Sequence, residues 1–153
     1  MKKILFLCHG NICRSPVAEL LFNREARSAG ISARAHAESA ALSSEAVGAD
    51  IYQPMRRLLI AEGFDNPSHI SRQATRSDIE KSDLVVVMDE ENIALYKRRF
   101  GEFGFDKVRL LLSYAGGNEI DDPWYTREFE RAMYEILAGV RGLVAAIAGG
   151  GRL

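Results

Sequence analysis

The chain has 153 residues, close to the usual size of one domain, and a chain of this length buries about two-thirds of its unfolded surface. Hydrophobic residues make up 47% of the sequence, which is ordinary for a globular protein. The net charge of −1, with both signs interspersed, gives no reason to expect a nucleic acid or a membrane as partner, and no apolar run approaches the ~18 residues of a membrane span.

The N-terminus carries two lysines before a short apolar stretch, which superficially suggests a secretory signal peptide. That stretch ends at Cys8, and it is shorter than the apolar region of about 7–15 residues in such peptides, so we expect a cytoplasmic protein. No internal repeat, low-complexity segment or linker is visible. We therefore expect a single domain over residues 1–153, with a flexible tail at 149–153.

The first elements alternate between strand and helix. Ile4–Cys8 is a continuous apolar run, as expected of a strand that is buried on both faces. From Pro16 to Ala29, apolar residues recur at helical spacing, and Gly30 is expected to end that helix. Ala33–Glu38 alternates alanine with polar residues, which fits a half-exposed edge strand.

The middle of the chain continues this alternation. Residues 40–53 are loop-like, and the helix that follows them is expected to end near Gly63. Ser77 or Asp78 is expected to cap a short turn. The fully apolar run Leu84–Met88 predicts the third strand.

The last third completes the pattern. Asp89 is expected to open another helix, and Val108–Leu112 is predicted to be the fourth strand. After a loop of about a dozen residues, apolar residues at helical spacing predict a long final helix before the glycines at 149–151. Gly139 and Gly142 lower its intrinsic helix propensity, so we expect packing to hold it.

Strand–helix alternation of this kind predicts an α/β fold in three layers, with a parallel sheet between helices on both faces. In such sheets, ligands bind beyond the carboxyl ends of the strands, at the point where the strand order reverses.

The segment directly after the first strand has the composition of an anion-binding turn. In a strand-to-helix turn, successive backbone N–H groups point inward, and the following helix N-terminus adds partial positive charge. Here a cysteine, Cys8, lies at the entrance and Arg14 follows six residues later, so a nucleophile and a cation would face one bound oxyanion. This combination predicts transfer of a phosphoryl group to sulfur, whereas a buried structural cysteine would explain neither the arginine nor its spacing.

The other residues of this turn suit the same chemistry. Helix N-termini and nearby cations favour the thiolate form of a cysteine, which is the nucleophile. Arg14 offers a planar fork of donors that matches two phosphoryl oxygens. Gly10 and Asn11 tolerate the positive φ that a loop with inward-facing amides requires. Ser15 can hydrogen-bond a thiolate or cap the coming helix, and Pro16 suits the first helical position.

This C-x5-R-S-P segment resembles the low-molecular-weight protein tyrosine phosphatase family, whose pattern is C-x-G-N-x-C-R-S-P. Further motifs fall in family order along essentially the whole chain: Ser39-Ala40-Ala41, Gly48, His69–Gln73, Met88–Asn92 and Asp122–Tyr125. The resemblance implies a flavodoxin-like (phosphotyrosine phosphatase I-like) fold whose four-stranded parallel sheet has the order 2-1-3-4. The order then reverses beside the first strand, which ends at Cys8.

A second chemical motif surrounds Pro123. An acid that protonates the leaving oxygen usually raises the rate by about 10²–10⁴. An aspartate before proline is confined to extended backbone, so its carboxyl group can be held over a cavity, although Asp-Pro is also common in ordinary turns. The resemblance implies that Asp122 is the general acid. Asp121 would raise the local negative potential, which favours retention of the Asp122 proton.

The rim of the site should set its specificity. Trp124 and Tyr125 are expected to form aromatic walls for a phenyl ring, with packing of the loop as the alternative role for either. The family often has an aromatic residue where this chain has Glu45, so the opposite wall would be polar and the preferred substrate stays open. His9 either contacts the substrate or is an exposed loop residue without a special role.

The resemblance also implies support for the loop. Ser39 and His69 are expected to hydrogen-bond Asn11 and to hold its conformation. Cys13 either captures an oxidised Cys8 in a reversible disulfide or packs the loop as a small buried residue. Two cysteines are too few for a disulfide scaffold or a zinc site. The expected phosphate-binding loop residues are His9, Gly10, Asn11, Ile12, Cys13 and Ser15.

These observations predict a metal-free and cofactor-free enzyme, a monomer or weak dimer, that hydrolyses phosphotyrosine in protein substrates through a phosphocysteine intermediate. An arsenate reductase shares the loop but needs further cysteines, and none follows Cys13. A protein arginine phosphatase is the closer alternative, although that branch of the family has threonine where this chain has Ile12 and a less aromatic acid loop. A phosphocysteine carrier domain would need neither Arg14 nor Asp122.

Overall fold

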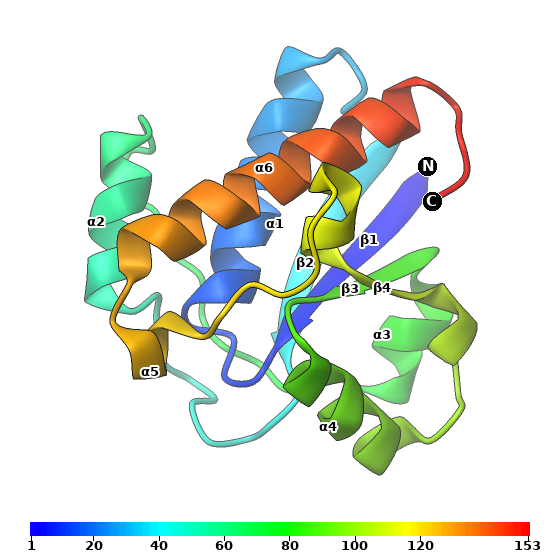
Figure 1. The fold of residues 1–153 in the computed structure, drawn as a ribbon, viewed down its shortest axis with the longest axis horizontal. Helices are drawn as coiled ribbons and strands as arrows, with labels where there is room; N and C mark the ends of the chain where they lie inside the picture. The colour runs from blue at the N-terminus through cyan, green and yellow to red at the C-terminus, as the bar shows by residue number, and fades with distance from the viewer.

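The computed structural model describes residues 1–153. Strands and helices alternate along the chain, with two 3₁₀ helices (η1, η2) in the second half (Figure 1): β1 (Lys2–Cys8), α1 (Arg14–Ser28), β2 (Ala35–Ala41), α2 (Gln53–Ala61), α3 (Arg76–Lys81), β3 (Leu84–Val87), α4 (Glu90–Phe100), η1 (Phe105–Lys107), β4 (Val108–Leu110), η2 (Leu111–Ala115), α5 (Pro123–Thr126) and α6 (Phe129–Ala148).

The four strands form one parallel sheet in the order β2-β1-β3-β4, which confirms the predicted topology. β1 is central, and it pairs with β2 from Lys2↔Ala35 to Cys8↔Ala41. β2 is an edge strand, as its alternating pattern predicted, but it extends to Ala41. The strand order reverses beside β1, so Cys8 ends the strand at the point where such sheets bind ligands.

Helices cover both faces of the sheet, which makes the three layers (Figure 1). Side chains alternate along β1, so that Ile4 and Phe6 pack on the face covered by α1, α2 and α6. Leu5 and Leu7 point to the opposite face, where α3 and α4 close a second, smaller core. Because both faces are buried, the central strands consist of continuous apolar runs.

Two predicted boundaries in the second half are wrong. The fourth strand ends at Leu110 instead of Leu112, because η2 begins at the next residue and packs against α6. The segment expected as a loop contains the short helix α5, which begins at Pro123 and is capped by the Asp122 carboxylate. A four-residue helix is too short to produce a periodic signal in the sequence.

Two helix starts also differ from the prediction. Pro16 lies at the third position of α1, because the helix already begins at Arg14. A proline is tolerated there, since the first N–H groups of a helix have no intrahelical partner. α3 is capped by Thr75 in a capping box with Asp78, so Ser77 is not the cap.

The two glycines in α6 allow η2 to approach closely. A Cβ atom on Gly142 would overlap the Tyr114 carbonyl oxygen, and one on Gly139 would lie 2.7 Å from Leu111 Cγ. Leu111 is fully buried under this contact. The final helix was expected to be held by packing because its two glycines lower its helix propensity. The same two glycines allow the close packing of α6 against η2.

The end of the chain returns toward β4. The Leu153 side chain packs against the larger core, and a backbone oxygen of Leu153 accepts a hydrogen bond from Arg109 Nε at 3.3 Å. The flexibility expected for residues 149–153 stays a prediction. None of the helices has the length and apolar character needed to cross a bilayer.

Replacing Gly142 with alanine is expected to lower the free energy of unfolding by about 1–3 kcal/mol, because overpacking a filled interface has that cost. Without this overlap, the higher helix propensity of alanine would raise the free energy of unfolding by about 1 kcal/mol. A variant that is more stable than wild type would therefore contradict the packing argument. Urea unfolding followed by circular dichroism measures the change. Gly151→Ala is the control, since the added Cβ would lie 3.9 Å from its nearest neighbour and should change stability by less than about 0.5 kcal/mol.

Candidate active site

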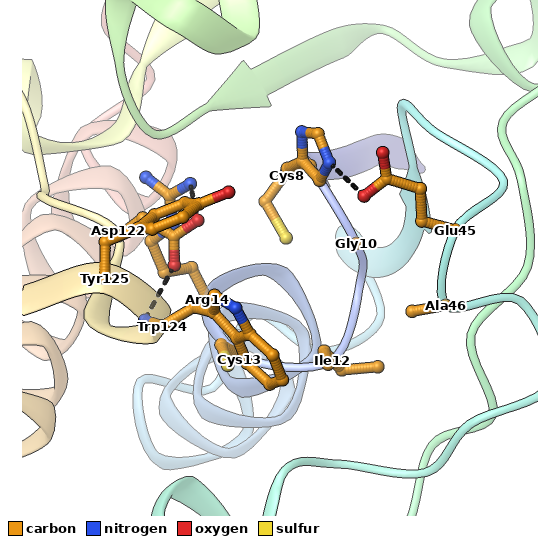
Figure 2. Close-up of a pocket in the computed structure, with 11 residues that line it drawn as sticks. Cys8, Gly10, Ile12, Cys13, Arg14, Glu45, Ala46, Asp122, Trp124 and Tyr125 are labelled. Carbon is orange, nitrogen blue, oxygen red and sulfur yellow. Dashed lines mark hydrogen bonds and ion pairs between the residues drawn. The ribbon is translucent and has the colours of Figure 1, made fainter. Parts of the chain in front are cut away.

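The segment between β1 and α1 forms one side of a cavity of about 230 Å³ at the carboxyl end of the sheet. Residues from three separate segments line this cavity (Figure 2): Cys8, His9, Gly10, Ile12, Cys13 and Arg14; Glu45 and Ala46; and Asp122, Trp124 and Tyr125. Every residue predicted for catalysis or for the substrate rim therefore lies at this cavity. Asn11, Ser15, Ser39 and His69 lie behind it and contact one another.

Cys8 is 3% exposed, and two polar groups surround its sulfur. The Asn11 N–H donates to Sγ at 3.3 Å, and Ser15 Oγ lies 3.0 Å from Sγ. Ser15 Oγ already accepts a hydrogen bond from Asn11 Nδ2 at 2.7 Å, so its own proton is free to point at the sulfur. Both groups would stabilise negative charge on Sγ.

Asn11 has a φ of 57°, in the left-handed region that most residues avoid. Its side chain is fully buried; Oδ1 contacts His69 Nε2 at 2.8 Å, and Nδ2 donates to Ser39 Oγ at 3.0 Å. Ser71 Oγ also donates to the Gly10 carbonyl at 2.8 Å. These contacts hold the strained turn.

The prediction of positive φ is right for Asn11 and wrong for Gly10. A Cβ on Gly10 would meet Ala46 and Ile12 at 3.6 and 3.7 Å, which are ordinary contacts. Neither the backbone conformation at position 10 nor contact with a neighbouring residue therefore requires glycine there.

Arg14 is 2% exposed and lies at the inner end of the cavity. Its Nη1 donates to Asp89 Oδ2 at 2.6 Å and to the Ile120 carbonyl at 2.7 Å, and its Nη2 lies 3.4 Å from Asp122 Oδ2. Burial by itself would lower the Arg14 pKa, but nearby negative charges outweigh it and raise the pKa; they belong to Cys8, Asp89 and Asp122. The guanidinium therefore stays charged although it is almost completely enclosed.

Asp89 was predicted only as the start of a helix. Its Oδ1 does cap α4, since it accepts from Asn92 N–H at 2.7 Å, and its Oδ2 holds Arg14. A signal was available in the sequence: Asp89 follows the buried strand β3, and β3 lies beside β1 in the 2-1-3-4 order. The carboxyl ends of neighbouring parallel strands meet at one edge, so Asp89 lies close to the segment between β1 and α1.

Asp122 serves two purposes with its two oxygens. Oδ1 accepts from Trp124 N–H at 3.0 Å and caps α5, while Oδ2 faces Arg14. The backbone at Asp122 is extended (φ −75°, ψ 112°), as expected before Pro123. The turn is therefore present, and the same carboxylate also faces Arg14; its role as general acid stays a prediction.

The aromatic rim is anchored on one side. The Trp124 ring packs against Tyr52 with centroids 4.8 Å apart, and Tyr52 in turn packs against Phe129 at 5.8 Å. Trp124 remains 45% exposed and Tyr125 73% exposed, so both still face the cavity mouth. Trp124 therefore packs within the loop as one of the two roles predicted, and its role as a wall for a phenyl ring stays a prediction. Tyr52, which supports it, was not singled out by the sequence.

The opposite wall is polar, as the departure at Glu45 implied. His9 Nε2 and Glu45 Oε2 lie 2.8 Å apart at the cavity (Figure 2).

A half-buried carboxylate that sequence reasoning missed extends the support of the loop. Glu19 Oε1 accepts a hydrogen bond from Ser39 Oγ at 2.8 Å and lies 3.6 Å from His69 Nδ1. Burial raises the pKa of Glu19, and burial together with the nearby Arg72 charge lowers the pKa of His69. Glu19 sits on the face of α1 that meets β2, a placement that only the packed structure reveals.

Both cysteines are free and buried. Burial raises the pKa of Cys13 to about 12, and the neighbouring Cys8 and Asp122 add to this increase. Cys13 is therefore a neutral thiol near pH 7. Its reversible pairing with Cys8 stays a prediction.

Comparison with known proteins agrees with this geometry. The family model for low molecular weight phosphotyrosine protein phosphatase matches residues 3–151. The low molecular weight protein-tyrosine-phosphatase YfkJ of Bacillus subtilis is 31% identical over 150 residues, which are 96% of each chain. Its crystal structure matches with a TM-score of 0.92 at 30% identity, covering 99% of this chain and 98% of YfkJ.

Two further relatives span nearly the same length. A low molecular weight protein-tyrosine-phosphatase of Streptomyces coelicolor is 36% identical over 155 residues, with 95% of this chain and 93% of the relative covered. A mutant of YwlE from Bacillus subtilis matches with a TM-score of 0.84 at 26% identity, over 96% and 99% of the two chains, and another YwlE structure is described as an arginine phosphatase. The chain therefore belongs to the low molecular weight phosphotyrosine protein phosphatase family.

Proposed function

We propose that this protein hydrolyses phosphotyrosine in protein substrates through a phosphocysteine intermediate. The observation that carries the proposal is the convergence of Cys8 Sγ, the Arg14 guanidinium and the Asp122 carboxylate on one cavity. The N-terminus of α1, which begins at Arg14, and the Arg14 guanidinium would supply the positive potential that a phosphate dianion needs.

In the first step, the Cys8 thiolate attacks phosphorus, so that an S–P bond forms and the P–O bond to the phenol breaks. Asp122 gives its proton to the leaving oxygen. With Nη1 of Arg14 held by Asp89 and Ile120, Nε and Nη2 remain for two phosphoryl oxygens. The 3.4 Å contact between Arg14 and Asp122 then gives way to phosphate, which suits an Asp122 that is protonated in this step.

In the second step, the Asp122 carboxylate accepts a proton from water, and the resulting nucleophile attacks phosphorus. The S–P bond breaks, inorganic phosphate leaves and the thiolate is restored. Ser15 and the Asn11 N–H, which contact Sγ, would stabilise the departing sulfur anion. Each step thus uses groups that are already in position.

The rim supports an aryl phosphate. A phenyl ring between Trp124 and Tyr125 would gain about 0.5–1.5 kcal/mol beyond the burial of its area. A phosphoserine has no ring to place there. We also propose that the protein acts in the cytoplasm, because its chemistry needs a reduced Cys8 and the cytosol keeps thiols reduced.

The substrate class can be tested with matched peptides that carry phosphotyrosine, phosphoserine or phosphoarginine. We expect phosphotyrosine to give the highest kcat/KM, measured by phosphate release, because only that side chain fills the space between the aromatic residues. A higher kcat/KM for phosphoarginine would assign the protein instead to the activity described for YwlE, which shares its fold.

Cys8→Ser is expected to reduce turnover of an aryl phosphate below about 1% of wild type, since a serine hydroxyl is a far weaker nucleophile here. Vanadate should still bind, because the amides and Arg14 remain. Binding is measurable by fluorescence, since Trp124 is the single tryptophan and lines the cavity. Cys13→Ser is the matched control and should reduce kcat far less. Turnover above the 1% level in Cys8→Ser would remove Cys8 from this role.

Asp122→Asn is expected to lower kcat by about 10²–10⁴ for a poor leaving group, with a smaller loss as the phenol becomes more acidic. The measurement is kcat/KM across a series of aryl phosphates, which reports the first step. Asp121→Asn is the control and should retain the leaving-group dependence of wild type. If Asp121→Asn showed the steeper dependence, the acid would be Asp121.

A further inference from the structure

The size of the cavity implies that most of a substrate lies outside it. At about 230 Å³ the cavity is smaller than the roughly 300–1,000 Å³ of pockets that enclose drug-sized ligands. It has room for one side chain, so the residues that flank the phosphorylated one must cross the rim. The exposed groups at the rim are therefore the ones that flanking residues meet.

Glu45 is the outermost charged group at this rim. Its side chain is 73% exposed, and it stands across the cavity from Trp124 and Tyr125 (Figure 2). It is held in place by the 2.8 Å contact with His9 Nε2. A carboxylate only accepts hydrogen bonds, so Nε2 must carry the proton in this contact.

Apart from its partner His9, no basic side chain lines the mouth of the cavity beside Glu45. The cavity has one permanent cation, Arg14, which is 2% exposed and already paired with Asp89. The nearest arginine in sequence to the aromatic rim, Arg127, does not line the cavity. Its guanidinium lies over the Tyr52 ring and donates to Tyr52 Oη at 3.1 Å. A flanking residue at this wall therefore meets a carboxylate.

We propose that Glu45 selects substrates in which a basic residue directly flanks the phosphotyrosine, and disfavours those with an acidic residue there. The inference rests on the proposed function. Phosphate binding at the bottom of the cavity needs positive potential, whereas the rim has negative charge. The bottom of the cavity thus favours the negatively charged phosphate, and the rim favours positively charged flanking residues. This arrangement excludes highly acidic segments by repulsion.

The expected preference is modest because the contact is exposed. An exposed ion pair contributes little, so a flanking lysine should raise kcat/KM by about 1.5- to 5-fold over glutamine. A flanking glutamate should lower it by a similar factor, which makes the lysine-to-glutamate ratio about 2- to 25-fold. The ratio should shrink between about 0.02 and 0.5 M salt, because screening removes exposed charge interactions.

The test uses two phosphotyrosine peptides that differ only in lysine or glutamate on both sides of the phosphorylated residue. The measured quantity is the ratio of their kcat/KM values, which cancels any general loss of activity in a variant. Wild type should prefer the lysine peptide, Glu45→Gln should bring the ratio close to one, and Glu45→Lys should invert it. Glu80→Gln is the matched control, because Glu80 is exposed, has no ion pair and does not line the cavity.

Each outcome separates the two proposals. A wild-type ratio of one or below, or a ratio unchanged in Glu45→Gln, would overturn the role of Glu45 while leaving the phosphatase intact. A ratio that falls equally in Glu80→Gln would show an effect of net charge and would also overturn it. Hydrolysis of p-nitrophenyl phosphate without hydrolysis of either peptide would contradict the proposed function itself.

Discussion

The geometry of the site depends on one strained residue. Asn11 adopts a left-handed backbone conformation that costs of the order of 1–3 kcal/mol, and this conformation turns its N–H toward Cys8 Sγ. The cost is offset by a buried side-chain amide whose partners come from three different segments: Ser15 in α1, Ser39 in β2 and His69 in the loop before α3. The loop that holds the sulfur is therefore fixed by the tertiary structure as a whole.

The two acidic partners of Arg14 follow a common design. Asp89 and Asp122 each use Oδ1 to cap a helix and Oδ2 to face the arginine. A capping carboxylate has little rotational freedom, because one of its oxygens is bound to backbone N–H. The positions of both carboxylates near Arg14 are consequently set by where α4 and α5 begin.

Much of this structure could be predicted from local patterns. The apolar runs of β1 and β3 and the amphipathic helices α1 and α6 carry strong periodic signals, and the loop from Cys8 to Ser15 has a specific spacing. The contributions that were missed depend on contacts between segments far apart in sequence. Asp89 reaches Arg14 across 75 positions, and Tyr52 meets Trp124 only because α2 and α5 are neighbours in space. Gly10 shows the converse error, since its residue type permitted a conformation that the loop does not use.

The stack of Trp124, Tyr52 and Phe129 has a consequence for the time course of catalysis. It ties α5, and with it Asp122, to α2 and α6, whose inner faces are part of the larger core. Many enzymes bring their acid into place by closing a lid, and opening that lid then limits turnover. Here the contacts made in folding already place Asp122, the acid of our proposal, beside Arg14. In that role Asp122 would need no closing lid, and phosphate would leave by the path along which the substrate arrived.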